Sequence, residues 1–109
     1  MKTLIKNGRV YDFNNGLDGK YDILIEGNKI FEINKNIKNQ GYEVIDAEGK
    51  IIIPALIDMH THLREPGFEE KETVKTGCEA AAAGGFSAVA AMPNTKPIAD
   101  NPAVVEHLK

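Results

Sequence analysis

The sequence contains a single cysteine, no tryptophan and no long apolar run. One cysteine, Cys78, cannot form an intrachain disulfide, so nothing indicates an oxidising compartment; we expect it to be a small core residue. No stretch approaches the roughly 20 apolar residues of a membrane-spanning helix. The N-terminus also lacks the apolar segment of a signal peptide. We therefore expect a cytoplasmic protein with no membrane partner.

Acidic residues slightly outnumber basic ones. The chain has 13 lysines and arginines against 16 acidic residues, a formal net charge of −3. Nucleic-acid binding needs clustered basic side chains, so we expect no nucleic-acid partner. The hydrophobic share of 42% is that of an ordinary globular protein, and 109 residues suffice for one small domain with a modest core.

Residues 1–54 have the pattern of a small all-β unit, with short apolar stretches separated by Gly, Asn and Asp. Asn7 and Gly8 both tolerate positive φ and predict a hairpin turn, and similar turns are predicted at 27–28 and 48–49. The strands predicted around these turns are 3–5, 9–13, 21–26, 29–33, 43–46 and 50–53.

The pattern changes to β-α-β after Pro54. The predicted elements are a buried strand at 56–59, a helix at 70–83, a second buried strand at 86–92 and a helix at 102–109. Gly84 and Gly85 are expected to end the first helix, and Asn101 to cap the second. Two parallel strands need further strands and helices to bury both faces, so we expect the N-terminal piece of a larger α/β protein.

His60 and His62 are the first candidates for chemistry. Residues i and i+2 of a strand point to the same side, so both imidazoles can converge on one metal ion. They follow an apolar strand, and active sites of α/β folds gather at the carboxyl ends of parallel strands. Neutral imidazole suits zinc and related divalent ions. Asp58 shares their parity, and either orients a histidine or caps local backbone groups.

Arg64 and Asn94 are candidates for binding a substrate. A turn at 66–67 would fix the direction of Arg64, whose planar fork suits a carboxylate. The alternative is a surface arginine paired with Glu65 or Glu69. Asn94 follows the second strand and would lie at the same sheet edge as His62, unless it is simply a turn or cap residue.

Three segments together resemble dihydroorotase of the longer bacterial class, in the amidohydrolase superfamily. They are PALIDMHTHLREPG at 54–67, AAGGF at 82–86 and MPNTKP at 92–97. The resemblance implies a fold with the N-terminal part of a composite β-sandwich (1–54) and the first βαβ of a TIM-like (β/α)8 barrel (55–109), truncated. Such a barrel needs about 200 residues or more.

The resemblance also implies the chemistry. His60 and His62 would bind zinc, with two ions in each full-length subunit. His62, Arg64 and Asn94 would hold N-carbamoyl-L-aspartate or dihydroorotate, which the family interconverts in pyrimidine biosynthesis. No catalytic residue falls within the segment, because the proton-shuttling aspartate is expected beyond Lys109. We therefore expect the segment alone to be inactive and to fold poorly.

Two positions depart from the family pattern, and other functions compete with this one. Ala55 replaces the usual glycine, which bears on local folding, and Ser87 replaces a common threonine while keeping the hydroxyl. The alternatives are a hydantoinase or allantoinase-type cyclic amidase, a non-catalytic subunit that stabilises aspartate transcarbamoylase, and a small β-rich binding module. The partners implied are the small-molecule substrate, and either a second copy of the chain or aspartate transcarbamoylase.

Overall fold

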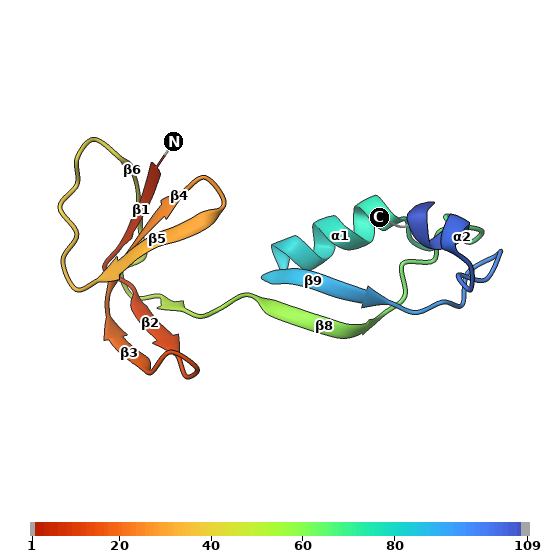
Figure 1. The fold of residues 1–109 in the computed structure, drawn as a ribbon, viewed down its shortest axis with the longest axis horizontal. Helices are drawn as coiled ribbons and strands as arrows, with labels where there is room; N and C mark the ends of the chain where they lie inside the picture. Colours follow the sequence, from red (N-terminus) through yellow and green to blue (C-terminus); the bar gives the residue numbers. More distant parts are fainter. Residues whose placement is uncertain (1, 108–109) are drawn as a thin grey trace. The chain divides into compact units, whose positions relative to one another are not determined.

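The computed structural model describes residues 2–107 and forms a mixed α/β protein made mostly of strands. The chain divides into two compact units at the junction of Pro54 and Ala55 (Figure 1). Within the described residues, neither helix is long and apolar enough to cross a membrane.

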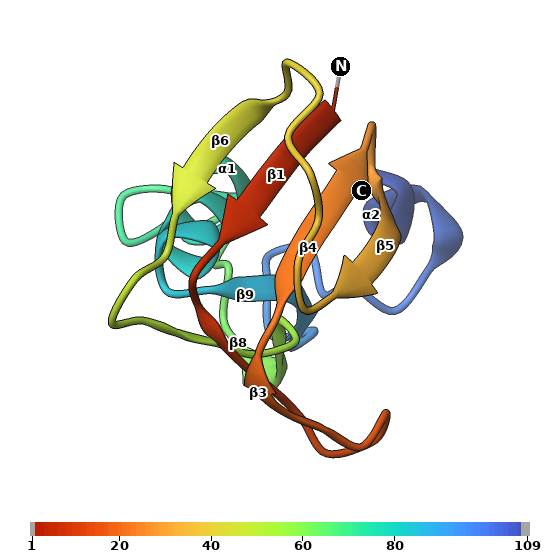
Figure 2. The same ribbon diagram turned by 90° about the vertical axis from the view of Figure 1, so that its left-hand side faces the viewer.

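The first unit contains two sheets. One has the strand order β5-β4-β1-β6, seen side by side in Figure 2, and the other has the order β3-β2-β7. The strands are β1 (Lys2–Lys6), β2 (Arg9–Asp12), β3 (Leu17–Lys20), β4 (Asp22–Glu26), β5 (Lys29–Asn34), β6 (Glu43–Asp46) and β7 (Ile51–Ile52). The predicted turn at 27–28 is confirmed, since β4 and β5 pair antiparallel across it. The strand β3, with Gly19 in its middle, was not predicted.

The two other predicted hairpins are wrong. β1 pairs in parallel with β6 in one sheet, and β2 pairs in parallel with β7 in the other. The segments around Asn7 and Ala47 therefore carry the chain from sheet to sheet. A side chain at Gly8 would meet the end of the Ile52 side chain and crowd Ala47, so glycine lets these segments pack closely.

Hydrogen bonds tie these two crossing segments together. Asn7 donates its side-chain N–H to Asp46 Oδ1 (2.8 Å), and Ala47 donates its backbone N–H to the Lys6 carbonyl (2.8 Å). The bond from Asn7, followed by one from the Glu48 backbone N–H, holds the pKa of Asp46 below its ordinary value, while desolvation weakly opposes them. Local polar contacts thus stabilise the crossing.

The core of the first unit is small. Leu4 is fully buried and packs with Leu24 and Ile37. The buried carboxylate of Asp22 accepts the Ile37 backbone N–H (2.9 Å) and lies 3.3 Å from Lys6 Nζ. This pairing satisfies a charge that burial alone would make costly, and it holds the loop after β5 against the sheet.

The second unit is a βαβ arrangement, as the sequence predicted. Its elements are β8 (Leu56–Thr61), α1 (Val74–Ala83), β9 (Phe86–Ala91) and α2 (Pro102–His107). β8 and β9 pair in parallel, and α1 contacts β9 (Figure 1). The last two residues of the helix predicted at 102–109 lie outside the described residues.

The ends of both helices follow local rules, with one correction. Gly85 has φ +84° just after α1, and Asn101 Oδ1 accepts the backbone N–H groups of Ala103 and Val104 at the start of α2, both as expected. The predicted start of α1 at residue 70 is wrong. Residues 69–71 form a turn instead, and α1 begins at Val74 because Thr73 caps it.

Burial in the second unit differs from the sequence pattern. Ile57 and Met59 of β8 are 61% and 72% exposed, so the expected cover on both faces of this strand is not found within residues 2–107. Cys78 is exposed rather than a core residue. Close packing of α1 is seen instead at Gly77, where a side chain would sit 2.6 Å from Leu63 Cδ2.

Candidate metal and substrate site

The two histidines lie at the carboxyl end of β8. His60 is within the strand, His62 follows it, and the ring centroids are 5.2 Å apart with the rings edge-on at 62°. Asp58 Oδ1 accepts the His60 backbone N–H (3.0 Å), which makes it a local backbone cap. The parallel pairing with β9 is irregular between Asp58 and Thr61, so the register of the sheet shifts beside His60.

Asn94 reaches this edge from the loop after β9. Its Oδ1 lies 2.8 Å from His62 Nδ1. An amide oxygen only accepts, so this contact is a hydrogen bond when Nδ1 carries the proton, and in that neutral tautomer the Nε2 lone pair of His62 is available for a metal. The parallel pairing of β8 with β9 therefore brings His62 and Asn94 together, although they are 32 positions apart in the sequence.

Arg64 begins the turn that follows His62. It has φ +66°, a left-handed conformation that is uncommon outside glycine, and its carbonyl accepts the Phe68 backbone N–H (3.0 Å). The Arg64 side chain is partly buried, and its guanidinium has no hydrogen bond or ion pair among residues 2–107. It is therefore available for a ligand.

The loops that carry Arg64 and Asn94 are in direct contact. Lys96 donates its backbone N–H to the Pro66 carbonyl (2.9 Å). A side chain at Gly67, whose φ is +96°, would collide with the Lys96 carbonyl. Thr95 is 7% exposed and donates its hydroxyl to the Pro97 carbonyl (2.8 Å), which stabilises the second loop.

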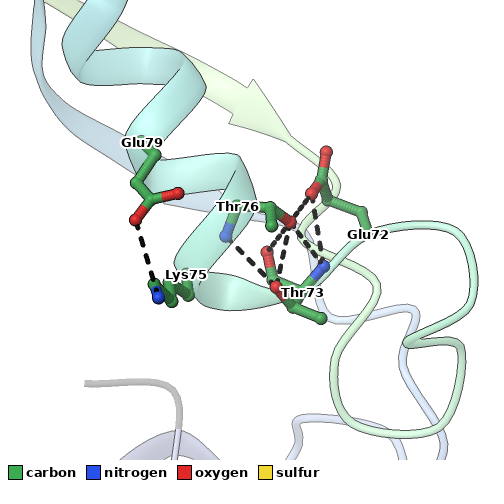
Figure 3. A network of polar contacts seen from close by, with 5 residues as sticks. All are labelled: Glu72, Thr73, Lys75, Thr76 and Glu79. Carbon is green, nitrogen blue, oxygen red and sulfur yellow. Dashed lines mark hydrogen bonds and ion pairs between the residues drawn. The ribbon is translucent and has the colours of Figure 1, made fainter.

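The start of α1 lies just beyond the Arg64 turn, and a set of polar contacts fixes it (Figure 3). The Thr73 hydroxyl accepts the Thr76 backbone N–H (3.1 Å), and Thr76 Oγ1 accepts the Thr73 backbone N–H (3.1 Å). This reciprocal pair is a capping box in which Thr76 occupies position N3, where glutamate or glutamine is usual. The Thr76 hydroxyl also donates to Glu72. The helix therefore offers a firm support for the preceding loop.

The donor set fits a divalent metal in part. Two imidazoles on one strand end, one of them with its Nδ1 engaged by an amide oxygen, match the way histidines bind zinc. The part of the chain that the structure describes holds no group of three or more His, Cys, Asp or Glu side chains around a common point. Residues 2–107 thus bring two imidazoles together at this strand end and place no third such side chain beside them.

Comparison with known proteins gives the class and then the family. The dihydropyrimidinase from Brevibacillus agri NCHU1002 is 36% identical and matches 85% of this chain and 20% of its own, with a TM-score of 0.74. Over the part that it covers, the chain is thus similar in fold to members of the amidohydrolase superfamily. The family described as Dihydro-orotase-like matches residues 49–109. The chain belongs to that family.

Curated relatives agree with this assignment. The dihydroorotase of Caldanaerobacter subterraneus subsp. tengcongensis is 57% identical over 109 residues, which are 100% of this chain and 25% of that protein. The dihydroorotase of Syntrophotalea carbinolica is 53% identical over 108 residues, or 99% of this chain and 25% of its own length. The chain thus spans about a quarter of the length of the curated relatives that it matches.

Proposed function

We propose that this chain supplies the N-terminal part of a zinc-dependent dihydroorotase, which interconverts N-carbamoyl-L-aspartate and dihydroorotate. The observation that carries the proposal is the arrangement at the end of β8 and β9. Two histidines lie beside an amide, and the next loop presents an arginine whose side chain has no hydrogen bond or ion pair among residues 2–107. A carboxylate-bearing substrate fits Arg64 and Asn94, because one offers a charged fork and the other a neutral hydrogen-bonding amide.

The fold supports a specific place for each unit. Residues 1–54 would form part of a composite β-sandwich, and residues 55–109 the first two strands and helices of a (β/α)8 barrel. The parallel pairing of β8 with β9 agrees with the start of such a barrel. The exposed side chains of Ile57 and Met59 agree with it too, since later barrel elements would cover them.

His60 and His62 would hold zinc, and two ions per full-length subunit follow from the family resemblance. Zinc, when bound, would act as a Lewis acid toward the amide carbonyl. This chain's own residues bind and orient: Asn94 holds the tautomer of His62, and Arg64 fixes the substrate carboxylate. The aspartate that would move the proton is not among these residues and would come from later in the protein.

The substrate preference of the full-length protein tests this proposal. We expect kcat/KM for dihydroorotate to exceed that for hydantoin or allantoin by at least about 100-fold, because only dihydroorotate has the carboxylate that Arg64 would bind. The 109-residue chain alone should show no turnover in the same spectrophotometric assay. A preference for hydantoin or allantoin would favour another cyclic amidase. No turnover of any of the three would favour a non-catalytic subunit.

The contact between Asn94 and His62 makes a separate prediction for metal binding. Asn94→Ala should weaken zinc binding by about 10- to 100-fold, because the proton on Nδ1 loses its acceptor. Asn94→Asp keeps an acceptor oxygen but repels a substrate carboxylate, so it should retain zinc while KM rises. Zinc titration against a competing chelator and steady-state kinetics separate the two effects. Wild-type zinc affinity in Asn94→Ala would show that the amide does not orient His62.

A further inference from the structure

Glu65 connects the Arg64 turn to the helix that follows it. Its Oε2 accepts the backbone N–H of Val74, the first residue of α1, at 2.7 Å. The first turn of α1 contains no acidic residue, so this carboxylate comes from outside the helix, nine positions earlier in the chain. A negative charge at this end is favourable, because the first N–H groups of a helix have no partner within it.

The residue before Glu65 needs such a restraint. Arg64 has φ +66°, and a residue with a side chain keeps this conformation only where its surroundings impose it. The Phe68 N–H bonds to the Arg64 carbonyl within the turn. The Lys96 N–H bonds to the Pro66 carbonyl from the loop that carries Asn94. The bond from the Val74 N–H to Glu65 adds a restraint that joins the turn to the helix.

We propose that Glu65 is a positioning residue, which anchors the Arg64 turn to the start of α1 and so fixes the backbone from which the guanidinium projects. The role of that guanidinium in holding a substrate carboxylate rests on the proposed function, whereas the anchoring does not. A small rotation of the turn backbone would move the end of the long arginine side chain further than its base. Loss of the anchor should therefore weaken substrate binding more than it disturbs the metal site.

Three variants of the full-length protein test the proposal. Glu65→Gln keeps an oxygen that can accept the Val74 N–H. Glu65→Asp keeps the charge but is one methylene too short to reach. Glu70→Ala is the matched control, because Glu70 is exposed in the same loop and has no hydrogen bond or ion pair among the described residues. Hydrogen exchange at the amides of residues 64–65 and 67–68 and of Val74, zinc content and steady-state kinetics are measured for each.

We expect exchange at these amides to rise at least about 10-fold in Glu65→Asp, and KM for N-carbamoyl-L-aspartate to rise by about 10-fold with zinc content unchanged. Glu65→Gln should stay within about threefold of wild type in both, which identifies the hydrogen bond and not the charge as the anchor. Glu65→Asp behaving like Glu70→Ala in exchange and in KM would overturn the proposal. A wild-type protein without dihydroorotase activity would refute the proposed function, and the exchange comparison would still decide the role of Glu65.

Discussion

Replacing His60 by alanine in the full-length protein is expected to lower zinc affinity by more than about 100-fold and kcat/KM for dihydroorotate by about 1,000-fold or more. Losing an imidazole that binds the metal directly should cost at least as much affinity as losing a group that merely orients one. The rate falls because the Lewis acid contributes several kcal/mol to transition-state stabilisation, and about 4 kcal/mol corresponds to 1,000-fold. Metal analysis of the purified variant and initial-rate kinetics measure the two losses.

Cys78→Ser provides the control for His60→Ala. Cysteine is also a zinc ligand in many proteins, and Cys78 is exposed in the same βαβ unit. It lies on α1, away from the strand ends that carry the histidines, so its replacement should leave zinc content and rate unchanged. Full zinc content in His60→Ala would contradict the assignment of this histidine as a ligand. Zinc loss in Cys78→Ser would mean that the zinc site does not lie at the end of β8.

The arrangement at the strand ends follows from short-range patterns in the sequence. Apolar runs before His60 and before Asn94 predict two buried strands, and a helix between them predicts that the strands are parallel. Parallel strands bring their carboxyl ends to one edge, so the approach of His62 and Asn94 could be expected from topology alone. The 2.8 Å contact and the tautomer that follows from it could not be expected from topology, because they depend on the side-chain conformations of both residues.

Sequence patterns fail where a residue has more than one structural use. Gly8 after Asn7 predicts a hairpin, yet the structure uses glycine there to let β1 and β2 part into different sheets beside Ala47. Positive φ and close approach both require glycine, and the sequence does not distinguish them. The contact between Glu65 and α1 could not be predicted for a different reason. A helix cap supplied from nine residues away has no local signature, whereas the Thr73 cap directly precedes its helix.

Arg64→Ala in the full-length protein is expected to lower kcat/KM for dihydroorotate by about 100- to 1,000-fold and to leave zinc content unchanged. Removing one partner of a buried, hydrogen-bonded charge pair typically costs about 2–5 kcal/mol, which corresponds to a loss of this size. The metal should stay because, among the described residues, Arg64 makes no hydrogen bond to His60 or His62. Zinc analysis together with rates over a range of substrate concentrations provides both measurements.

Arg64→Lys separates the charge of this side chain from its shape. Lysine keeps the positive charge but cannot form two parallel hydrogen bonds to a carboxylate, so its kcat/KM should lie between those of wild type and Arg64→Ala. Lysine, alanine and arginine are strained to about the same extent by the φ of +66° at this position. Backbone strain therefore does not distinguish either variant from wild type. A zinc loss in Arg64→Ala that matches the loss of rate would mean that this arginine supports the metal site. Unchanged kinetics in both variants would mean that the substrate carboxylate binds elsewhere, and the dihydroorotase proposal would lose its carboxylate site.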